Sequence, residues 1–382
     1  MTARHLPMPG AVVGPYARRG LPGERKQAVG WWARRRLNRR LEAAEYLYKQ
    51  LRWVDAEREL RAVLEAAADG AGSLVGSART LLAQALRMQG RLQEAESEAR
   101  SAIAAQPVPG RFEERDGQDV LALVLGDMGR HQEAADLLAA TAAARARITS
   151  SGQRLVLKSR SDRLQHLAYL GLHEEVVAEA AAVKTAASGT DDIHRIMLPL
   201  AAANGLAFSL SLHGHYEQAE QVLLPVLEEA HRQGLGRFLM VLHLGAARAL
   251  TGQGRAQEAL AAVDQAQETF DRTPGAGALT HDLSAILLAR SAALLASSRP
   301  ADAEHEARRC LSQCERRLGP GHHRALEAAT VLGTALADLH RNDEAVELLH
   351  TTHDAWHTRF GHDHHGTIRA RQLLAALTDQ SF

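Results

Sequence analysis

One short pattern of apolar and polar positions recurs along most of the chain. A turn residue is followed at the fourth position by Asp, Glu or Gln, and at the fifth by a small apolar residue. The eight turn residues, spaced 39 to 44 residues apart, are Leu51, Gly90, Gly129, Gly171, Gly214, Gly254, Ser298 and His340. A regular period of this length indicates a repeat architecture rather than one globular core.

The flanks of each turn predict two helices. Leucine stands four residues before all eight turns, and the residue seven before is small in seven of them, Leu164 being the exception. Apolar residues spaced three and four apart before the turn, such as Leu82 and Leu86, are typical of an amphipathic helix. Glycine suits the turn because it accepts a left-handed backbone, and the acid after it favours the start of the next helix. Each period is therefore predicted to be a helical hairpin.

The order of small residue, Leu, turn Gly and Ala resembles the tetratricopeptide repeat over residues 31–362. The period exceeds the usual length of about 34 residues, and the loop phrases 318–322 and 360–364 are similar to those of the longer kinesin-light-chain type. The resemblance implies an all-α, right-handed α-solenoid of about eight helical hairpins, with a capping helix near residues 365–378. We expect a basic, disordered segment over residues 1–30 and the solenoid over 31–382.

The first helix of each hairpin is expected to line a concave groove. Positions ten, six, three and two residues before each turn lie outside the apolar stripe and face that groove. The candidate groove residues are Gln84, Arg87, Asp119, Asp127, Gln165, Tyr169, Asn204, Phe208 and Arg248. The resemblance implies that Asn side chains grip a peptide backbone, because an amide both donates and accepts. Only Asn204 matches that pattern, so a helical and an extended ligand both remain open.

Charge is uneven along the chain although 45 basic residues balance 45 acidic ones. Residues 1–40 carry ten Lys or Arg and one acid, which leaves 35 basic against 44 acidic residues in the remainder. A basic cluster follows Trp31 and Trp32, and its members are Arg34, Arg35, Arg36, Arg39 and Arg40. Clustered arginines beside aromatics can hold phosphates, so nucleic acid is a less favoured alternative partner.

Targeting signals are not evident in the sequence. The first 30 residues hold no apolar stretch of about 7 to 15 residues that a secretory signal requires. The longest span without Asp, Glu, Lys or Arg, residues 196–216, is interrupted by Pro199 and Asn204. We therefore expect no membrane span and a cytoplasmic protein, and 41 Arg against 4 Lys favours a bacterial source.

Candidate chemistry is sparse. His350, His353 and His357 share one helical face at a spacing that can chelate a metal ion, but no zincin signature accompanies them. Cys310 and Cys314 are expected to fill small apolar positions. The sequence contains no phosphate loop, dinucleotide fingerprint or nucleophile elbow.

The prediction is accordingly a non-catalytic scaffold that binds a protein or peptide in its groove, with no cofactor and no metal. Two alternatives remain: a peptide-responsive regulator whose basic N-terminus contacts nucleic acid or a regulatory partner, and a metal-dependent activity at the His350, His353 and His357 cluster. The sequence leaves the oligomeric state open.

Overall fold

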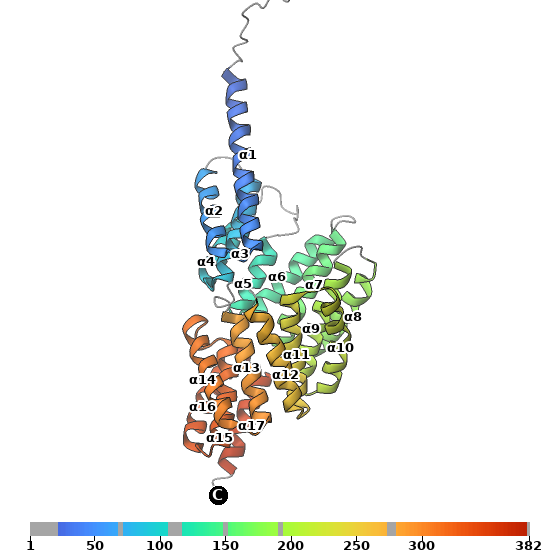
Figure 1. Ribbon diagram of the computed structural model, residues 1–382, viewed down its shortest axis with the longest axis vertical. Helices are drawn as coiled ribbons and strands as arrows, with labels where there is room; N and C mark the ends of the chain where they lie inside the picture. Colours follow the sequence, from blue (N-terminus) through green and yellow to red (C-terminus); the bar gives the residue numbers. More distant parts are fainter. Residues whose placement is uncertain are drawn as a thin grey trace, which may run out of the picture.

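A computed structural model describes residues 22–67, 72–105, 117–147, 152–189, 194–272 and 280–379. In these ranges the chain forms seventeen α-helices and no β-strand. Successive helices run antiparallel and stack side by side, with the first hairpins at one end of the molecule and the last at the other (Figure 1). The predicted right-handed α-solenoid is confirmed.

The helices form eight hairpins and a cap, in chain order. They are α1 (Pro22–Lys49) and α2 (Trp53–Ala66), α3 (Gly72–Met88) and α4 (Leu92–Ala104), α5 (Gly117–Asp127) and α6 (His131–Ala146), α7 (Gly152–Tyr169) and α8 (His173–Ala187), α9 (His194–Leu212) and α10 (Tyr216–Arg232), α11 (Gly236–Gly252) and α12 (Ala256–Asp271), α13 (Thr280–Ala296) and α14 (Pro300–Arg317), α15 (His323–Asp338) and α16 (Asn342–Phe360), and the cap α17 (His365–Asp379). Hairpins are numbered 1 to 8 in this order.

Helix α1 begins inside the segment predicted to be a disordered tail. It starts at Pro22 and runs unbroken to Lys49, projecting past the other helices of hairpins 1 and 2 (Figure 1). Residues 1–21 of the predicted tail lie outside the described residues.

The eight predicted turn residues all have the left-handed backbone that closes each first helix. Their φ angles lie between 56° at Ser298 and 80° at Gly214. The amide after the turn then donates to the carbonyl five residues earlier, as Arg91 does to Leu86 at 3.0 Å. Outside the predicted pattern, Gly234 joins α10 to α11 with φ 64° and repeats this bond.

Small residues line the seam where the two helices of each hairpin meet. The residue five after each turn has no exposed surface; the eight are Ala56, Ala95, Ala134, Val176, Ala219, Ala259, Ala303 and Ala345. On the opposing helix of hairpin 8, a Cβ added to Gly333 would lie 2.6 Å from Leu349 Cγ. The helix axes therefore approach too closely for larger side chains at these positions.

Ionic bonds tie some neighbouring hairpins together. Arg91, directly after the turn of hairpin 2, bonds Glu57 of hairpin 1 at 2.7 Å and Glu94 of its own helix at 2.6 Å. The same arrangement joins hairpins 2 and 3 through Arg130, hairpins 5 and 6 through Arg255, and hairpins 7 and 8 through Arg341. At the position of this arginine, hairpin 4 carries Leu172 and hairpin 5 carries His215. The junctions between hairpins 3 and 4 and between hairpins 4 and 5 therefore lack the bond from arginine to the preceding hairpin.

The superhelix returns on itself five hairpins further along. Trp53 and Met88, near the turns of hairpins 1 and 2, share one buried cluster with Met240, Phe270 and Ile286 of α11, α12 and α13. Hairpin 3 likewise contacts hairpin 8 through His322, and hairpin 4 contacts the cap through His364. The concave side is thus bounded by two stretches of chain that are distant in sequence.

Candidate binding groove

The predicted groove residues divide into exposed and buried sets. Six are partly exposed: Gln84, Arg87, Asp127, Gln165, Asn204 and Arg248. Three are buried: Asp119 and Tyr169 are 4% exposed and Phe208 is 9% exposed. The groove lining available to a ligand is therefore smaller than the helical positions alone indicated.

Three of these residues come together in one stack across hairpins 4, 5 and 6. The Tyr169 and Phe208 rings lie 4.7 Å apart between centroids, and the Arg248 guanidinium sits 4.6 Å above the Phe208 ring. The His131 ring stacks on the Tyr169 ring, with centroids 4.3 Å apart and nearly parallel planes. A cation held over an aromatic face keeps its outer edge available for an acidic group.

The two amide side chains beside this stack belong to the same surface. Asn204 Oδ1 lies 3.6 Å from the point where a Cβ on Gly245 of α11 would stand, so the glycine leaves room for the amide. Gln165 hydrogen-bonds the Tyr169 hydroxyl from the preceding turn of α7. Both amides therefore flank the aromatic row from neighbouring helices.

Asp119 does not face an open groove. Arg145 of α6, which has no exposed surface, binds both Asp119 carboxylate oxygens at 2.9 and 3.0 Å. The same guanidinium also donates to Ser159 Oγ at 2.6 Å and to the Leu155 carbonyl at 3.3 Å. The carboxylate thus neutralises a buried arginine between hairpins 3 and 4 rather than meeting a ligand.

Arg87 and Asp127 bind each other across neighbouring hairpins. The Arg87 Nε lies 2.6 Å from Asp127 Oδ2, and both side chains are about one-fifth exposed. The charge of Asp127, together with its hydrogen bond, raises the pKa of Arg87 against the opposing effect of burial. This pair holds the end of α3 against the end of α5.

Loops of the last hairpins reach across to the turns of hairpins 3 and 4. His322 Nε2 lies 2.9 Å from the Asp127 carbonyl, and His364 Nε2 lies 2.8 Å from the Tyr169 carbonyl. Arg359 adds bonds to the carbonyls of Met128 and Gly129 at 3.4 and 3.3 Å. These contacts join residues about half the chain length apart and close the superhelix around the stack.

A chain of three imidazoles lies inside this closure. His131 Nδ1 is 3.2 Å from His166 Nδ1, and His131 Nε2 is 3.2 Å from His323 Nδ1. Burial lowers the pKa of His166 to about 4, although the nearby Asp127 charge opposes the shift. Sequence reasoning missed this cluster, since its members come from α6, α7 and α15 and share no local spacing.

The basic residues of α1 lie apart from the groove. Arg34, Arg35, Arg36 and Arg39 are exposed, whereas Arg40 is partly buried and bonds Glu59 of α2 at 3.0 Å. The side chains of Trp31 and Trp32 lie outside the described residues. The structure thus presents four arginines on the projecting helix and uses the fifth to hold the hairpin together.

The C-terminal histidines do not form a metal site. His350 and His357 are exposed, and His353 Nδ1 lies 3.1 Å from Asp354 Oδ1. Across the described parts of the chain, no group of three or more His, Cys, Asp or Glu residues is arranged to hold a metal ion. The helical spacing of His350, His353 and His357 is therefore not matched by a ligand cluster in the described residues.

The two cysteines are fully buried and unbonded to each other as a disulfide. Cys310 donates to the Ser284 carbonyl at 3.4 Å, and its hydrogen bond with Cys314 together with burial raises the pKa of the Cys310 thiol. Both behave as the small core residues that their positions predicted.

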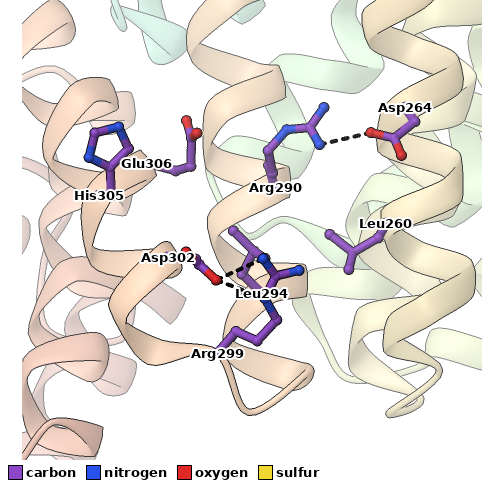
Figure 2. Close-up of a pocket in the computed structure, with 8 residues that line it drawn as sticks. All are labelled: Leu260, Asp264, Arg290, Leu294, Arg299, Asp302, His305 and Glu306. Atoms are coloured by element: carbon purple, nitrogen blue, oxygen red, sulfur yellow. Dashed lines mark hydrogen bonds and ion pairs between the residues drawn. The ribbon is translucent and has the colours of Figure 1, made fainter.

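A shallow depression of about 270 Å³ lies between α12 and α14 (Figure 2). In Figure 2, Arg290 points toward Asp264 and Arg299 toward Asp302, and these pairs are 2.8 and 2.7 Å long. Because these charges are already paired, the depression does not select a ligand of either sign.

One described helix is long and apolar enough to cross a membrane by length and composition. It is the Arg195–Leu212 part of α9, and half of that stretch is buried inside the fold. Helix α9 packs against α7, α8, α10 and α11. A core helix of a soluble protein passes the same test.

Comparisons with known proteins agree with this architecture. No family model and no curated protein matches the chain. A Rap protein solved in complex with competence and sporulation factor aligns over 91% of this chain and 98% of its own, with a TM-score of 0.54 and 11% identity. The apo form of RapI aligns over 90% and 98%, with a TM-score of 0.47 and 10% identity. A kinesin-light-chain-like repeat protein from Podospora anserina aligns over 53% and 95%, with a TM-score of 0.38 and 19% identity.

Stacked helical hairpins around a shared inner surface define the class of α-solenoid repeat proteins. Within that class, the chain has the tetratricopeptide-repeat fold that its sequence predicted.

Proposed function

We propose that the protein is a non-catalytic scaffold that binds another protein or a peptide on its concave surface. The observation that carries the proposal is the partly exposed Arg248, which lies over the buried Phe208 ring on the concave side, with the partly exposed amides of Asn204 and Gln165 on neighbouring helices. Partly exposed groups contributed by three successive hairpins suit an elongated ligand. The likeness of fold to a Rap protein solved with competence and sporulation factor supports the same reading.

The chemistry of these groups favours a segment that carries an acidic side chain next to an apolar one. Arg248 is partly exposed and offers guanidinium donors, while the aromatic face beneath it excludes water. Asn204 and Gln165 add amides that can bond a ligand backbone. Buried aromatic and arginine residues commonly dominate the energy of protein interfaces.

A pull-down with the intact chain tests the proposal. The groove variant combines Asn204→Ala with Arg248→Ala, and the matched control combines Gln221→Ala with Arg232→Ala on the exposed face of α10. Quantitative mass spectrometry of captured proteins should show at least one partner that the groove variant loses about tenfold or more, which corresponds to about 1.4 kcal/mol.

The control variant should retain that partner at the level of the unmodified chain. Equal capture of every protein by all three chains would contradict binding on the concave surface. Circular dichroism of each variant establishes that a loss of capture does not come from unfolding.

A second candidate function rests on the basic helix α1. Its exposed Arg34, Arg35, Arg36 and Arg39 lie on a helix that projects beyond its neighbours (Figure 1), while the residues after position 40 carry an excess of acids. We infer that this helix contacts a polyanion such as nucleic acid, because projecting guanidinium groups reach phosphates without moving the solenoid.

Fluorescence anisotropy with a labelled 20-base-pair DNA duplex tests this second function. Affinity should fall steeply with added salt, with a log–log slope of about −0.9 for each phosphate contact. Changing Arg34, Arg36 and Arg39 to Gln should abolish most binding, whereas changing Arg308, Arg309 and Arg316 to Gln on α14 should not. Absence of binding to the duplex at low salt would rule this function out.

A further inference from the structure

Two histidines join the start of one helix to the end of another 195 residues earlier. His322 Nδ1 accepts a hydrogen bond from the Arg324 backbone N–H at 3.1 Å, and its Nε2 donates to the Asp127 carbonyl. His364 repeats both bonds, with Gly366 N–H at 3.2 Å and the Tyr169 carbonyl. Only a neutral imidazole that carries its proton on Nε2 makes both bonds at once.

Each histidine therefore has two structural tasks. Its Nδ1 caps the N-terminus of α15 or α17, where the first helical amides otherwise lack acceptors. Its Nε2–H satisfies a carbonyl at the C-terminal end of α5 or α7, where the last carbonyls lack donors. The two bridges, which we name the histidine clasp, tie hairpins 3 and 4 to hairpin 8 and the cap.

The clasp spans two junctions that lack the arginine bond between hairpins, a bond that the junction of hairpins 6 and 7, with Leu260 at the position of the acid, lacks as well. The arginine that ties other hairpins is replaced by Leu172 in hairpin 4 and by His215 in hairpin 5. The acid that binds this arginine from the preceding hairpin is replaced by Ala135 in hairpin 3 and by Val177 in hairpin 4. Two successive junctions thus lack this arginine bond, although Lys158 of hairpin 4 lies 3.6 Å from Asp119 of hairpin 3, and the clasp connects hairpin 3 with hairpin 8 beyond them.

We propose that the histidine clasp holds the superhelix closed at neutral pH and that protonation of its imidazoles opens it. A proton on Nδ1 would face the backbone N–H that it now accepts from. It would also stand at the positive end of a helix dipole, where a cation is disfavoured. The cap is consequently lost together with the closure.

The groups around His322 reinforce this dependence on a neutral ring. The Arg359 guanidinium from α16 donates to the Gly129 carbonyl, two residues after the carbonyl that His322 binds, whereas the Arg324 guanidinium lies 3.9 Å from Glu327. His323 lies 4.2 Å away between ring centroids. From α5, the Asp127 carboxylate is engaged by Arg87, which reduces its ability to stabilise an imidazolium.

His364 has an apolar and cationic environment. The rings of Trp356 and Phe360 from α16 stack on it at 5.0 and 4.6 Å, and Tyr169 of α7 supplies the carbonyl. His365 of α17 lies 4.0 Å away, next to Arg248 of α11 and His213 of α9. Within the described ranges, the acid whose charge acts on His364 is Glu327 of α15.

The direction of the pH effect follows from these surroundings. Burial lowers the pKa of His364, against its backbone bond and the charge of Glu327, and lowers the pKa of His365 to about 3. In an opened chain these rings return toward the ordinary value near 6.5. The open state then binds more protons below that pH, so acid shifts the equilibrium toward opening.

Opening the clasp would separate Tyr169 from the C-terminal loops and widen the concave surface. This consequence for ligand binding rests on the proposed function. The clasp itself does not, because it can be measured on the chain without a ligand.

Förster transfer between hairpin 3 and hairpin 8 of the full chain tests the clasp. Dyes are attached at Gln132→Cys and Thr358→Cys, both exposed, while Cys310 and Cys314 are fully buried. With the native histidines, transfer should be high at pH 7.5 and should drop as the pH falls below 6.5, because burial holds the pKa of His364 below its ordinary value.

The decisive variant combines His322→Asn with His364→Asn. Asparagine still caps a helix but is too short to reach the opposing carbonyl, so transfer should be low already at pH 7.5 with helix content unchanged by circular dichroism. The matched control, His350→Asn with His357→Asn on exposed α16 positions, should behave as the native chain.

Either of two results would overturn the proposal. One is a native chain whose transfer at pH 7.5 is unchanged at every lower pH at which circular dichroism shows intact helices. The other is a folded double variant at His322 and His364 that remains as closed as the native chain at pH 7.5. Because no ligand is present, neither result bears on whether the concave surface binds a partner.

Discussion

Asp119→Ala is expected to lower the free energy of unfolding of the central hairpins by about 3 to 5 kcal/mol. The carboxylate makes two bonds, at 2.9 and 3.0 Å, to the guanidinium of Arg145, which has no exposed surface. Truncation would remove this carboxylate from a buried cation, to which Ser159 and the Leu155 carbonyl offer only neutral oxygens. Lys158, 3.6 Å from Asp119, would lose a counter-charge as well.

Hydrogen exchange of α5 to α7 is the appropriate measurement, because a repeat array can open locally without unfolding as a whole. The paired change Asp119→Leu with Arg145→Met should recover most of the loss, since removing both charges also removes the desolvation cost. Asp302→Ala serves as a control, because this exposed acid should contribute less than about 1 kcal/mol. Equal protection in all three chains would mean that the buried pair carries no stability.

Ala134→Trp is expected to destabilise hairpin 3 by about 3 kcal/mol or more. Ala134 has no exposed surface and stands at the seam where α5 and α6 come closest. An indole cannot fit there without separating the two helices, and the damage should extend to hairpins 2 and 4 because each hairpin packs on its neighbours.

Ala140→Trp provides the matched control on the same helix. Ala140 is exposed, so the same substitution should change stability by less than about 0.5 kcal/mol. Urea unfolding followed by circular dichroism compares the two variants. Similar midpoints for both would show that the seam is assigned to the wrong face of α6.

The hairpins could be predicted from the sequence because every signal that forms them is local. Leu86, Gly90 and Ala95 lie within ten residues of one another, and helix period, turn and seam each depend on such short spacings. Leu51, Ser298 and His340 show how strong the pattern is, since they adopt the left-handed turn although they are not glycine.

The candidate site could be predicted only in part. Helical position alone indicated Tyr169, Phe208 and Arg248, and the structure brings these three together. The same reasoning placed Asp119 on the groove, because nothing near it in sequence reveals that Arg145, 26 residues later, occupies the space before it. The partners of His322 and His364 could not be predicted for the same reason, because each partner lies 195 residues earlier in the chain.

The sequence by itself thus determined that this chain is a series of paired helices, with small residues at the seams and a left-handed residue at each turn. Only the tertiary structure decided that the series closes on itself, that half-chain-distant loops meet, and that histidines occupy the contact. The physical reason is that the path of a superhelix is the sum of small rotations between successive hairpins. No single spacing encodes that sum, although it determines which distant residues meet.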